Sequence, residues 1–426
     1  MVFGNEACSS NYGLDASAAP LLPSVGGGDL RGRLSSQPKT FANVFIAIVG
    51  SGVLGLPYAF RRTGWAAGAL LLLAVAALTF HCMMLIVRTR RRLDLDGSAK
   101  IASFGDLGLA VSGSLGRLAV DAMIVLSQAG FCVGYLIFIS SSLTHLLPLS
   151  LPFLSSKALY VLAMLPFQLG LNSIRSLTLL APLSIFADVV DLGAMGVVIA
   201  EDVSIMVSRP PPIHAFAGPS VLLYGAGVAV YAFEGIGMVL PLEAEAADKS
   251  KFGRTLGLSM AFIALLYGLF GVLGYAAFGD DTRDIITTNL GAGVLTLLIQ
   301  LGLCINLFFT FPVMMNPVFE VAERWLCGKR YCWWLRWALV LAVSLAATLV
   351  PNFADFLSLV GSSVCVVLGF VLPAAFHLKV FSGELGWAEA TADIAIVVVG
   401  MGLAISGTWS SLMSIFNSPS PPADNL

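Results

Sequence analysis

Long apolar runs recur along the chain and are separated by short polar segments. A helix needs roughly 20 apolar residues, with a range of about 17 to 25, to cross a membrane. Counted on that rule, the pattern predicts eleven membrane-spanning helices, with approximate ranges 40–60, 64–88, 117–147, 157–173, 176–200, 216–240, 254–278, 288–313, 333–351, 354–377 and 390–413. The chain is therefore expected to be an all-α polytopic membrane protein.

Two predicted spans have unusual boundaries. No charged residue occurs between Asp284 and Glu320, which is too long a stretch for one upright helix. Pro312 and Pro317 predict that this helix is kinked or tilted and continues along the membrane surface. The ninth and tenth spans nearly touch at "VPNFADF", which predicts a tight hairpin between them.

The two ends of the chain differ from the spans in composition. Residues 1–38 are rich in Gly, Ser, Ala and Pro and lack the long apolar run of a signal peptide. This composition predicts a disordered tail that precedes a membrane domain at 39–415. Residues 416–426 are expected to form a flexible C-terminal tail.

Composition excludes a soluble class. The chain has 426 residues, of which 58% are hydrophobic and only 11% charged, and its mean hydropathy is +0.89. About a quarter of the residues of a typical soluble domain are charged. A net charge of -2 gives no indication of a nucleic-acid partner. The expected surroundings are therefore a lipid bilayer.

Cysteine and histidine give no motif for a metal or a cofactor. Most of the seven cysteines lie in apolar runs and none forms a CxxC pair, so we interpret them as small core residues and not as a disulfide framework. The four histidines are scattered. No GxSxG, HExxH or GxxxxGK[ST] motif occurs, so neither an enzyme nor an ATP-driven pump is expected.

Charge asymmetry predicts the orientation. All but five of the 23 basic residues fall in the tail and in alternate loops that share one side of the predicted map. The loops on the other side are acidic and include Glu201, Asp202, Asp280, Asp281 and Asp284. By the positive-inside rule the N-terminus is expected to be cytosolic and the C-terminus to lie outside the cell or in an organelle lumen.

The first span contains its own helix breakers. In "IVGSGVLGLPYAF" (48–60), three glycines are followed by a proline, and both residue types destabilise a helix. Backbone groups freed in hydrocarbon must be satisfied, so the break is expected to face protein, water or a ligand. Two half-helices would then offer amide groups to a carboxylate and carbonyls to an ammonium group, which together suit a zwitterion. Close helix packing through small residues is the alternative.

The sixth span has a similar pattern. "LLYGAGVAVYAFEGIGMVLPLE" (222–243) carries four glycines, Glu234 near its middle and Pro241 near its end. Interrupted spans at corresponding positions are typical of transporters built from inverted repeats. The predicted repeats are about 40–200 and about 216–377, with 390–413 as an extra helix.

A few polar side chains within the spans are candidates for function, because charges in lipid are costly. Glu234 lies in the predicted break and is expected to bind a proton, to pair with a substrate ammonium group or to cap the broken helix. Asp188 and Asp191 share one face of the fifth span, where they would line a water path or bond neighbouring hydroxyls. Asn306 and Thr310 in the eighth span face the site or make interhelical hydrogen bonds. Asp121 in the third span is expected to be interfacial.

Three segments resemble known transporters. They are "TFANVFIAIVGSGVLGLPYAFRRTGW" (40–65), "YAFEGIGMVLPLE" (231–243) and "MNPVFEVAE" (315–323). These segments resemble the amino acid/auxin permease family, in its vacuolar and proton-coupled branch, and most closely the plant-type vacuolar neutral amino acid transporters. The resemblance covers essentially residues 39–415.

The resemblance implies a fold, an activity and a site. The fold is the five-plus-five inverted-repeat fold of LeuT-like transporters, with spans one and six broken. The activity is secondary transport of small neutral amino acids, with protons as the coupling ion and no cofactor or metal, and with export from the vacuole lumen to the cytosol. A membrane sensor that binds amino acids with little flux is the alternative, and the plasma membrane is an alternative location. The implied substrate-binding residues are Ile48, Val49, Gly50, Ser51, Gly52, Val53, Leu54, Tyr231, Phe233 and Gly235, with Glu234 beside them.

Overall fold

The computed structural model describes residues 34–95, 97, 101–147, 156–174, 181–208, 211–291 and 293–417, and for 181–188 and 417 it describes the backbone alone. In chain order the helices are α1 (Gln37–Ile48), η2 (Ser51–Gly55), α2 (Leu56–Thr63), α3 (Trp65–Leu95), α4 (Phe104–Leu146), α5 (Ser156–Asn172), α6 (Ala181–Ser208), η4 (Pro219–Val221), α7 (Leu222–Ala232), η5 (Ile236–Met238), α8 (Val239–Glu245), α9 (Phe252–Phe278), η6 (Gly279–Asp281), η7 (Ile286–Thr288), α10 (Val294–Leu326), α11 (Trp333–Leu349), α12 (Phe353–Val360), η8 (Gly361–Cys365), η9 (Val367–Val371), α13 (Leu372–Val380) and α14 (Trp387–Asn417). The segments η8 and η9 are π-helical, and the other η segments are 3-10 helices.

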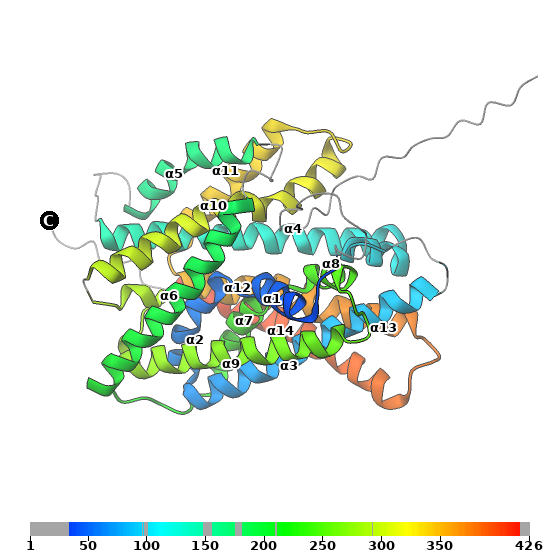
Figure 1. Cartoon of the computed structure of the whole chain (residues 1–426), viewed down its shortest axis with the longest axis horizontal. Coiled ribbons are helices and arrows are strands. Elements are labelled where there is room, and N and C mark those ends of the chain that lie inside the picture. The colour runs from blue at the N-terminus through cyan, green and yellow to red at the C-terminus, as the bar shows by residue number, and fades with distance from the viewer. Residues whose placement is uncertain are drawn as a thin grey trace, which may run out of the picture.

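The helices surround a central group. Figure 1 shows α1, α7 and α12 between α4 on one side and α3 with α9 on the other, with α5, α10 and α11 beyond α4. Helix α7 packs against α12, η8 and α3, and α4 packs against α10. The short helices are therefore enclosed by the long ones.

Not all of the described helices are long and apolar enough to cross a membrane. Seven of the described helices are long and apolar enough to cross a membrane, and the bent pair Gln37–Ile48 with Ser51–Thr63 makes eight if it counts as one span. Helices α5 and α11 have only 17 residues each. The structure thus confirms an all-helical polytopic membrane protein.

The structure refines the boundaries of two expected spans. Helix α4 begins at Phe104, where Ser103 and Asp106 form a capping box, but Ser112 and Gly113 are non-helical. The long part of α4 therefore starts after Gly113, close to the predicted start near 117. Helix α10 begins at Val294 and runs as one helix through both of its prolines to Leu326. Only three residues, 350–352, join α11 to α12, as the short connection in the sequence predicts.

The N-terminal end of the described chain is anchored. The backbone of Ser35 bonds to Glu245 and Ala247 in a short parallel bridge that joins the start of α1 to the end of α8. Helix α1 begins at Gln37, three residues before the predicted span. The other residues of the predicted tails, 1–33 and 418–426, lie outside the described residues.

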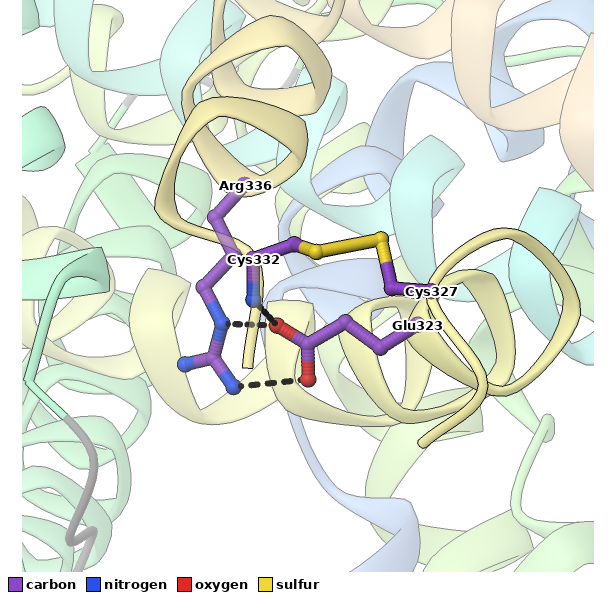
Figure 2. Close-up of a disulfide and its surroundings, with 4 residues drawn as sticks. All are labelled: Glu323, Cys327, Cys332 and Arg336. Carbon is purple, nitrogen blue, oxygen red and sulfur yellow. Dashed lines mark hydrogen bonds and ion pairs between the residues drawn. A yellow bond between two sulfur atoms is a disulfide. The ribbon is translucent and has the colours of Figure 1, made fainter. Parts of the chain in front are cut away.

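One expectation about the cysteines was wrong. Figure 2 shows a disulfide between Cys327 and Cys332 in the turn that joins α10 to α11. Beside it, the carboxylate of Glu323 accepts hydrogen bonds from the Cys332 amide (3.1 Å) and from Nε of Arg336 (2.7 Å). The spacing of the two cysteines in the sequence matches no disulfide motif. The turn between α10 and α11 brings their sulfur atoms together only in the folded chain. The free cysteines of the described chain are buried, as expected.

Candidate functional site

The first predicted break is present. Helix α1 ends at Ile48, Val49 and Gly50 are non-helical, and the chain continues through η2 into α2 with a bend of 53°. Residues 51–55 are all buried, whereas Val49 and Gly50 are half-buried. The glycine-rich sequence therefore interrupts the helix inside the protein, as its residue types predict.

The second predicted break lies between α7 and η5. Helix α7 ends at Ala232, and Phe233, Glu234 and Gly235 are non-helical before the chain turns into η5 and α8. Phe233 is fully buried and Glu234 is half-buried. Unlike the first break, this one does not bend the chain by more than 40°, so Pro219–Glu245 counts as one span.

The two breaks are in direct contact. A Cβ placed on Gly52 would lie 2.8 Å from Cα of Ala232 and 3.1 Å from Cδ1 of Tyr231. A Cβ placed on Gly235 would lie 2.9 Å from Cγ1 of Ile48. Both distances are shorter than a normal carbon–carbon contact of about 3.5–4.0 Å. Glycine at both positions therefore allows the two interrupted backbones to meet.

Side chains satisfy backbone groups at the breaks. The hydroxyl of Tyr267 donates to the carbonyl of Ile48 at 3.3 Å, so α9 caps the end of α1. The carboxylate of Glu234 lies beside the backbone amide of Ile236, at the start of η5. This position is compatible with capping of the broken helix, one of the roles open to Glu234.

Aromatic rings cover the second break. Phe131 of α4 packs edge-on against Tyr231 with ring centroids 4.8 Å apart, and Phe233 packs against Tyr267 at 5.2 Å. The hydroxyl of Tyr231 lies beside Ser51 of the first break. Phe131 and Tyr267 were missed by sequence reasoning, since nothing in their local sequence separates them from core aromatics.

The remaining polar candidates join α6 to α10. Nδ2 of Asn306 donates to Oδ1 of Asp191 at 2.7 Å, and Oγ1 of Thr310 donates to Asn306. The backbone of Asp188 belongs to α6, but its side chain lies outside the described part.

The two breaks and the polar group around Asp191 make up the candidate site. In the part of the chain that the structure describes, no three His, Cys, Asp or Glu side chains are placed to hold a metal ion. The site instead combines interrupted backbone, hydroxyls, an amide and two carboxylates in a mostly apolar surrounding. Such a set suits a small zwitterionic molecule.

A family model described as "Transmembrane amino acid transporter protein" matches residues 33–413. The chain belongs to this family. "Amino acid transporter AVT3C" of Arabidopsis thaliana is 63% identical over 98% of this chain and 99% of its own length. "Vacuolar amino acid transporter 3" of Saccharomyces cerevisiae is 28% identical over 89% of this chain and 56% of its own length. These findings confirm the family that the motifs indicated.

A solved structure supports the fold. Mhp1, a nucleobase-cation-symport-1 family transporter in a closed conformation, matches with a TM-score of 0.53 and 13% identity, over 93% of this chain and 94% of that one. The chain therefore has the overall fold of that transporter. The family and the relatives are transporters and not enzymes, as expected, and they give no support to the sensor alternative.

Ion pairs anchor the outer half of each broken helix in this transporter. At the end of α2, Nη1 of Arg62 lies 3.2 Å from Oδ1 of Asp355 on α12. At the end of α8, the carboxylate of Glu243 lies 3.0 Å from Arg90 and 2.7 Å from Arg91, both on α3. Sequence reasoning missed these pairs because their partners are far apart in the chain.

An open cleft of about 1380 Å³ lies at the α2 end of the transporter. Arg61, Arg62 and Asp355 contribute its charged walls, with Tyr58 beside them and part of α14 opposite. The guanidinium of Arg61 donates to the carbonyl of Thr282 at 2.9 Å. The cleft therefore leads from one surface to the end of the half-helix that follows the first break.

Proposed function

We propose that the chain is a secondary active transporter that moves small neutral amino acids out of the vacuole lumen into the cytosol, linked to protons. The family and the relatives support amino acid transport. The name of the yeast relative supports the vacuolar membrane as its location. Protons are proposed as the coupling ion because the spans carry carboxylates.

In this proposal the described helices form eleven spans. The bent pair α1–α2 is the first, α7 with α8 the sixth, and α12 through α13 the tenth. The first five and the next five form two inverted repeats, and α14 is the extra helix. With the N-terminus cytosolic, α2 points to the lumen and α8 to the cytosol, so the C-terminus is lumenal.

The contact between the two breaks is the observation that carries the proposal. Gly52 lies against Ala232, and Gly235 lies against Ile48. The proposed substrate site lies along this contact, at residues 48–54 and at Tyr231, Phe233 and Gly235. Their backbone groups would bind the carboxylate and ammonium groups that all amino acids share.

The ion pairs fit a mechanism of alternating access. The Arg62–Asp355 pair holds α2 against α12, and the pairs of Glu243 hold α8 against α3. With both formed, as here, each outer half-helix is held in place. Access from one side requires that the corresponding anchor opens while the other stays closed.

Uptake by the purified protein in liposomes tests the proposal. Labelled alanine or serine should enter with a rate that responds to an imposed pH gradient. Binding of amino acid without flux would instead support a sensor, and single-channel currents would support a channel. Flux that ignores the pH gradient would refute the proton link alone.

Glu234→Gln tests the proposed proton role of that side chain. The amide oxygen of Gln remains a hydrogen-bond acceptor beside the Ile236 amide but no longer takes up a proton. Flux of the variant should lose its dependence on pH, whereas Glu245→Gln, at the end of α8, should behave as the wild type. Retained flux with an unchanged pH profile would remove Glu234 from the proton mechanism.

A further inference from the structure

Asp202 is a buried carboxylate that the proposed transport mechanism leaves unused. It lies near the end of α6 and is fully buried, whereas its neighbour Glu201 is exposed. Neither carboxylate oxygen of Asp202 has a hydrogen-bond partner among the residues that the structure describes. The charge pattern had placed both residues in an acidic loop, so the burial of Asp202 is a correction to that expectation.

Asp202 lies where α2 packs against α9. A Cβ placed on Gly274 of α9 would lie 2.7 Å from Cγ of Pro57 and 3.4 Å from Oδ2 of Asp202. Pro57 is the second residue of α2 and directly follows the first break. The carboxylate therefore shares one packed contact with the half-helix that leads from the break to Arg62.

The surrounding charges do not compensate a negative Asp202. Besides Asp202, the described charged groups of α6, α9 and α2 are Asp191, Glu201, Arg254, Arg61 and Arg62. The titratable hydroxyls and thiols there and on α10 are those of Tyr58, Tyr267, Tyr275 and Cys304. Arg61 and Arg62 bond to Thr282 and Asp355. The hydroxyl of Tyr275 accepts a hydrogen bond from the His214 amide. Among the residues that the structure describes, the exposed carboxylate of Glu201 is the adjacent charge, and it repels a negative Asp202.

A buried carboxylate with neither donor nor counter-ion is strongly disfavoured in its charged form. The packing seen here is therefore compatible with the protonated carboxylic acid. In this packing Asp202 is fully buried, so its ionised form lacks water and a donor, and a movement of α2 away from α9 would open the contact beside it. Protonation of Asp202 and the position of α2 are therefore thermodynamically coupled.

We propose that Asp202 is a proton-binding site whose occupancy favours the packing of α2 against α9. One proton adds to one carboxylate oxygen, and no other reactant takes part. The site is separate from Glu234, which lies in the second break beside the Ile236 amide. The inference rests on the proposed function only in taking α2 as the half-helix that opens to the lumen.

Infrared spectroscopy of the purified protein tests the site directly. At neutral pH, the difference between the spectra of the wild type and Asp202→Asn should contain the carbonyl stretch of one protonated carboxylic acid. The difference between the wild type and Glu201→Gln should lack it, although this variant removes an acidic side chain one residue away. An unchanged band in Asp202→Asn would overturn the proposal.

Transport supplies the second measurement. In liposomes, acidification on the α2 side should change the uptake rate of the wild type and of Glu201→Gln, and this response should be lost in Asp202→Asn. A wild type with no response would refute the proton link of the proposed function, while the infrared result would still decide the site. A response of Asp202→Asn equal to that of the wild type would refute the link between Asp202 and α2.

Folding of the variants is checked by size-exclusion chromatography. Asn has nearly the shape of the protonated Asp side chain, so the variant should elute as the wild type does. If it does not, Asp202→Ala takes its place in the infrared measurement, because it also removes the carboxyl group. Persistence of the band in a folded Asp202→Ala protein would equally exclude the proposal.

Discussion

Gly52→Ala is the most direct test of the contact between the two breaks. The added Cβ would lie 2.8 Å from Cα of Ala232 and 3.1 Å from Cδ1 of Tyr231. Restoring a carbon–carbon contact of about 3.5 Å requires a shift of about 0.7 Å between the two segments. The closest atom belongs to the backbone of α7, so a change of side-chain rotamer does not relieve the clash.

The expected cost follows from this geometry. Overpacking of a well-packed interior typically costs about 1–3 kcal/mol, and we expect the upper part of that range because backbone must move. For chains above 200 residues, 1 kcal/mol changes the melting temperature by about 2 °C. The melting temperature of the purified Gly52→Ala protein should therefore fall by about 4–6 °C.

Gly50→Ala is the matched control. A Cβ at this position meets no atom within 4 Å, and its φ of -161° is extended backbone that any residue adopts. The control should melt at the wild-type temperature or slightly above it, since Ala lowers the entropy of the unfolded chain. Equal melting temperatures for the two variants would show that the breaks do not touch at Gly52.

Two further predictions concern loops outside the spans. Burial raises the pKa of Asp284, whose Oδ2 accepts a hydrogen bond from the Phe353 amide at 2.9 Å. The folded state therefore favours the protonated form, and stability is gained as the pH falls through the raised pKa towards the unfolded value of 3.8. Melting curves of Asp284→Asn should show a smaller gain on acidification than those of the wild type or of the exposed control Asp281→Asn. Replacing both Cys327 and Cys332 with Ser removes the loop-closure stabilisation of the disulfide, about 2 kcal/mol. Trypsin should therefore cut faster at the basic residues between these positions, as it should in the reduced wild-type protein. An unchanged cleavage rate would contradict this prediction.

The breaks were predictable because glycine and proline act locally. The residues of "VGSGVLGLP" disfavour a helix wherever they stand, so the end of α1 at Ile48 follows from sequence alone. The same holds for the non-helical residues around Gly235. The contact between the breaks could not be predicted in this way, because it depends on a fold that brings the first break beside α7.

The missed residues depend on distant parts of the chain. Asp202 follows the last apolar run of its span and thus resembles a loop residue, but in the fold it is fully buried near Gly274 of α9. Tyr267 has the local pattern of a core aromatic, and its role is visible only because Ile48 lies within reach. The start of α4 is different: Ser103 and Asp106 have the spacing of a capping box, so that boundary was open to prediction.

The two anchors of the broken helices are unequal, and this has a consequence for the order of opening. Glu243 is 1% exposed and its partner Arg90 is 13% exposed, whereas Arg62 is 30% exposed beside an almost buried Asp355. Removing one partner of a buried pair typically costs about 3–5 kcal/mol, while an exposed pair contributes about 0–1 kcal/mol. Water therefore screens the pair at α2 more than the pair at α8, and Glu243 also has Arg91 as a second partner. In the absence of substrate we therefore expect α2 to open before α8. The packing of α2 is also the one that a proton on Asp202 would favour.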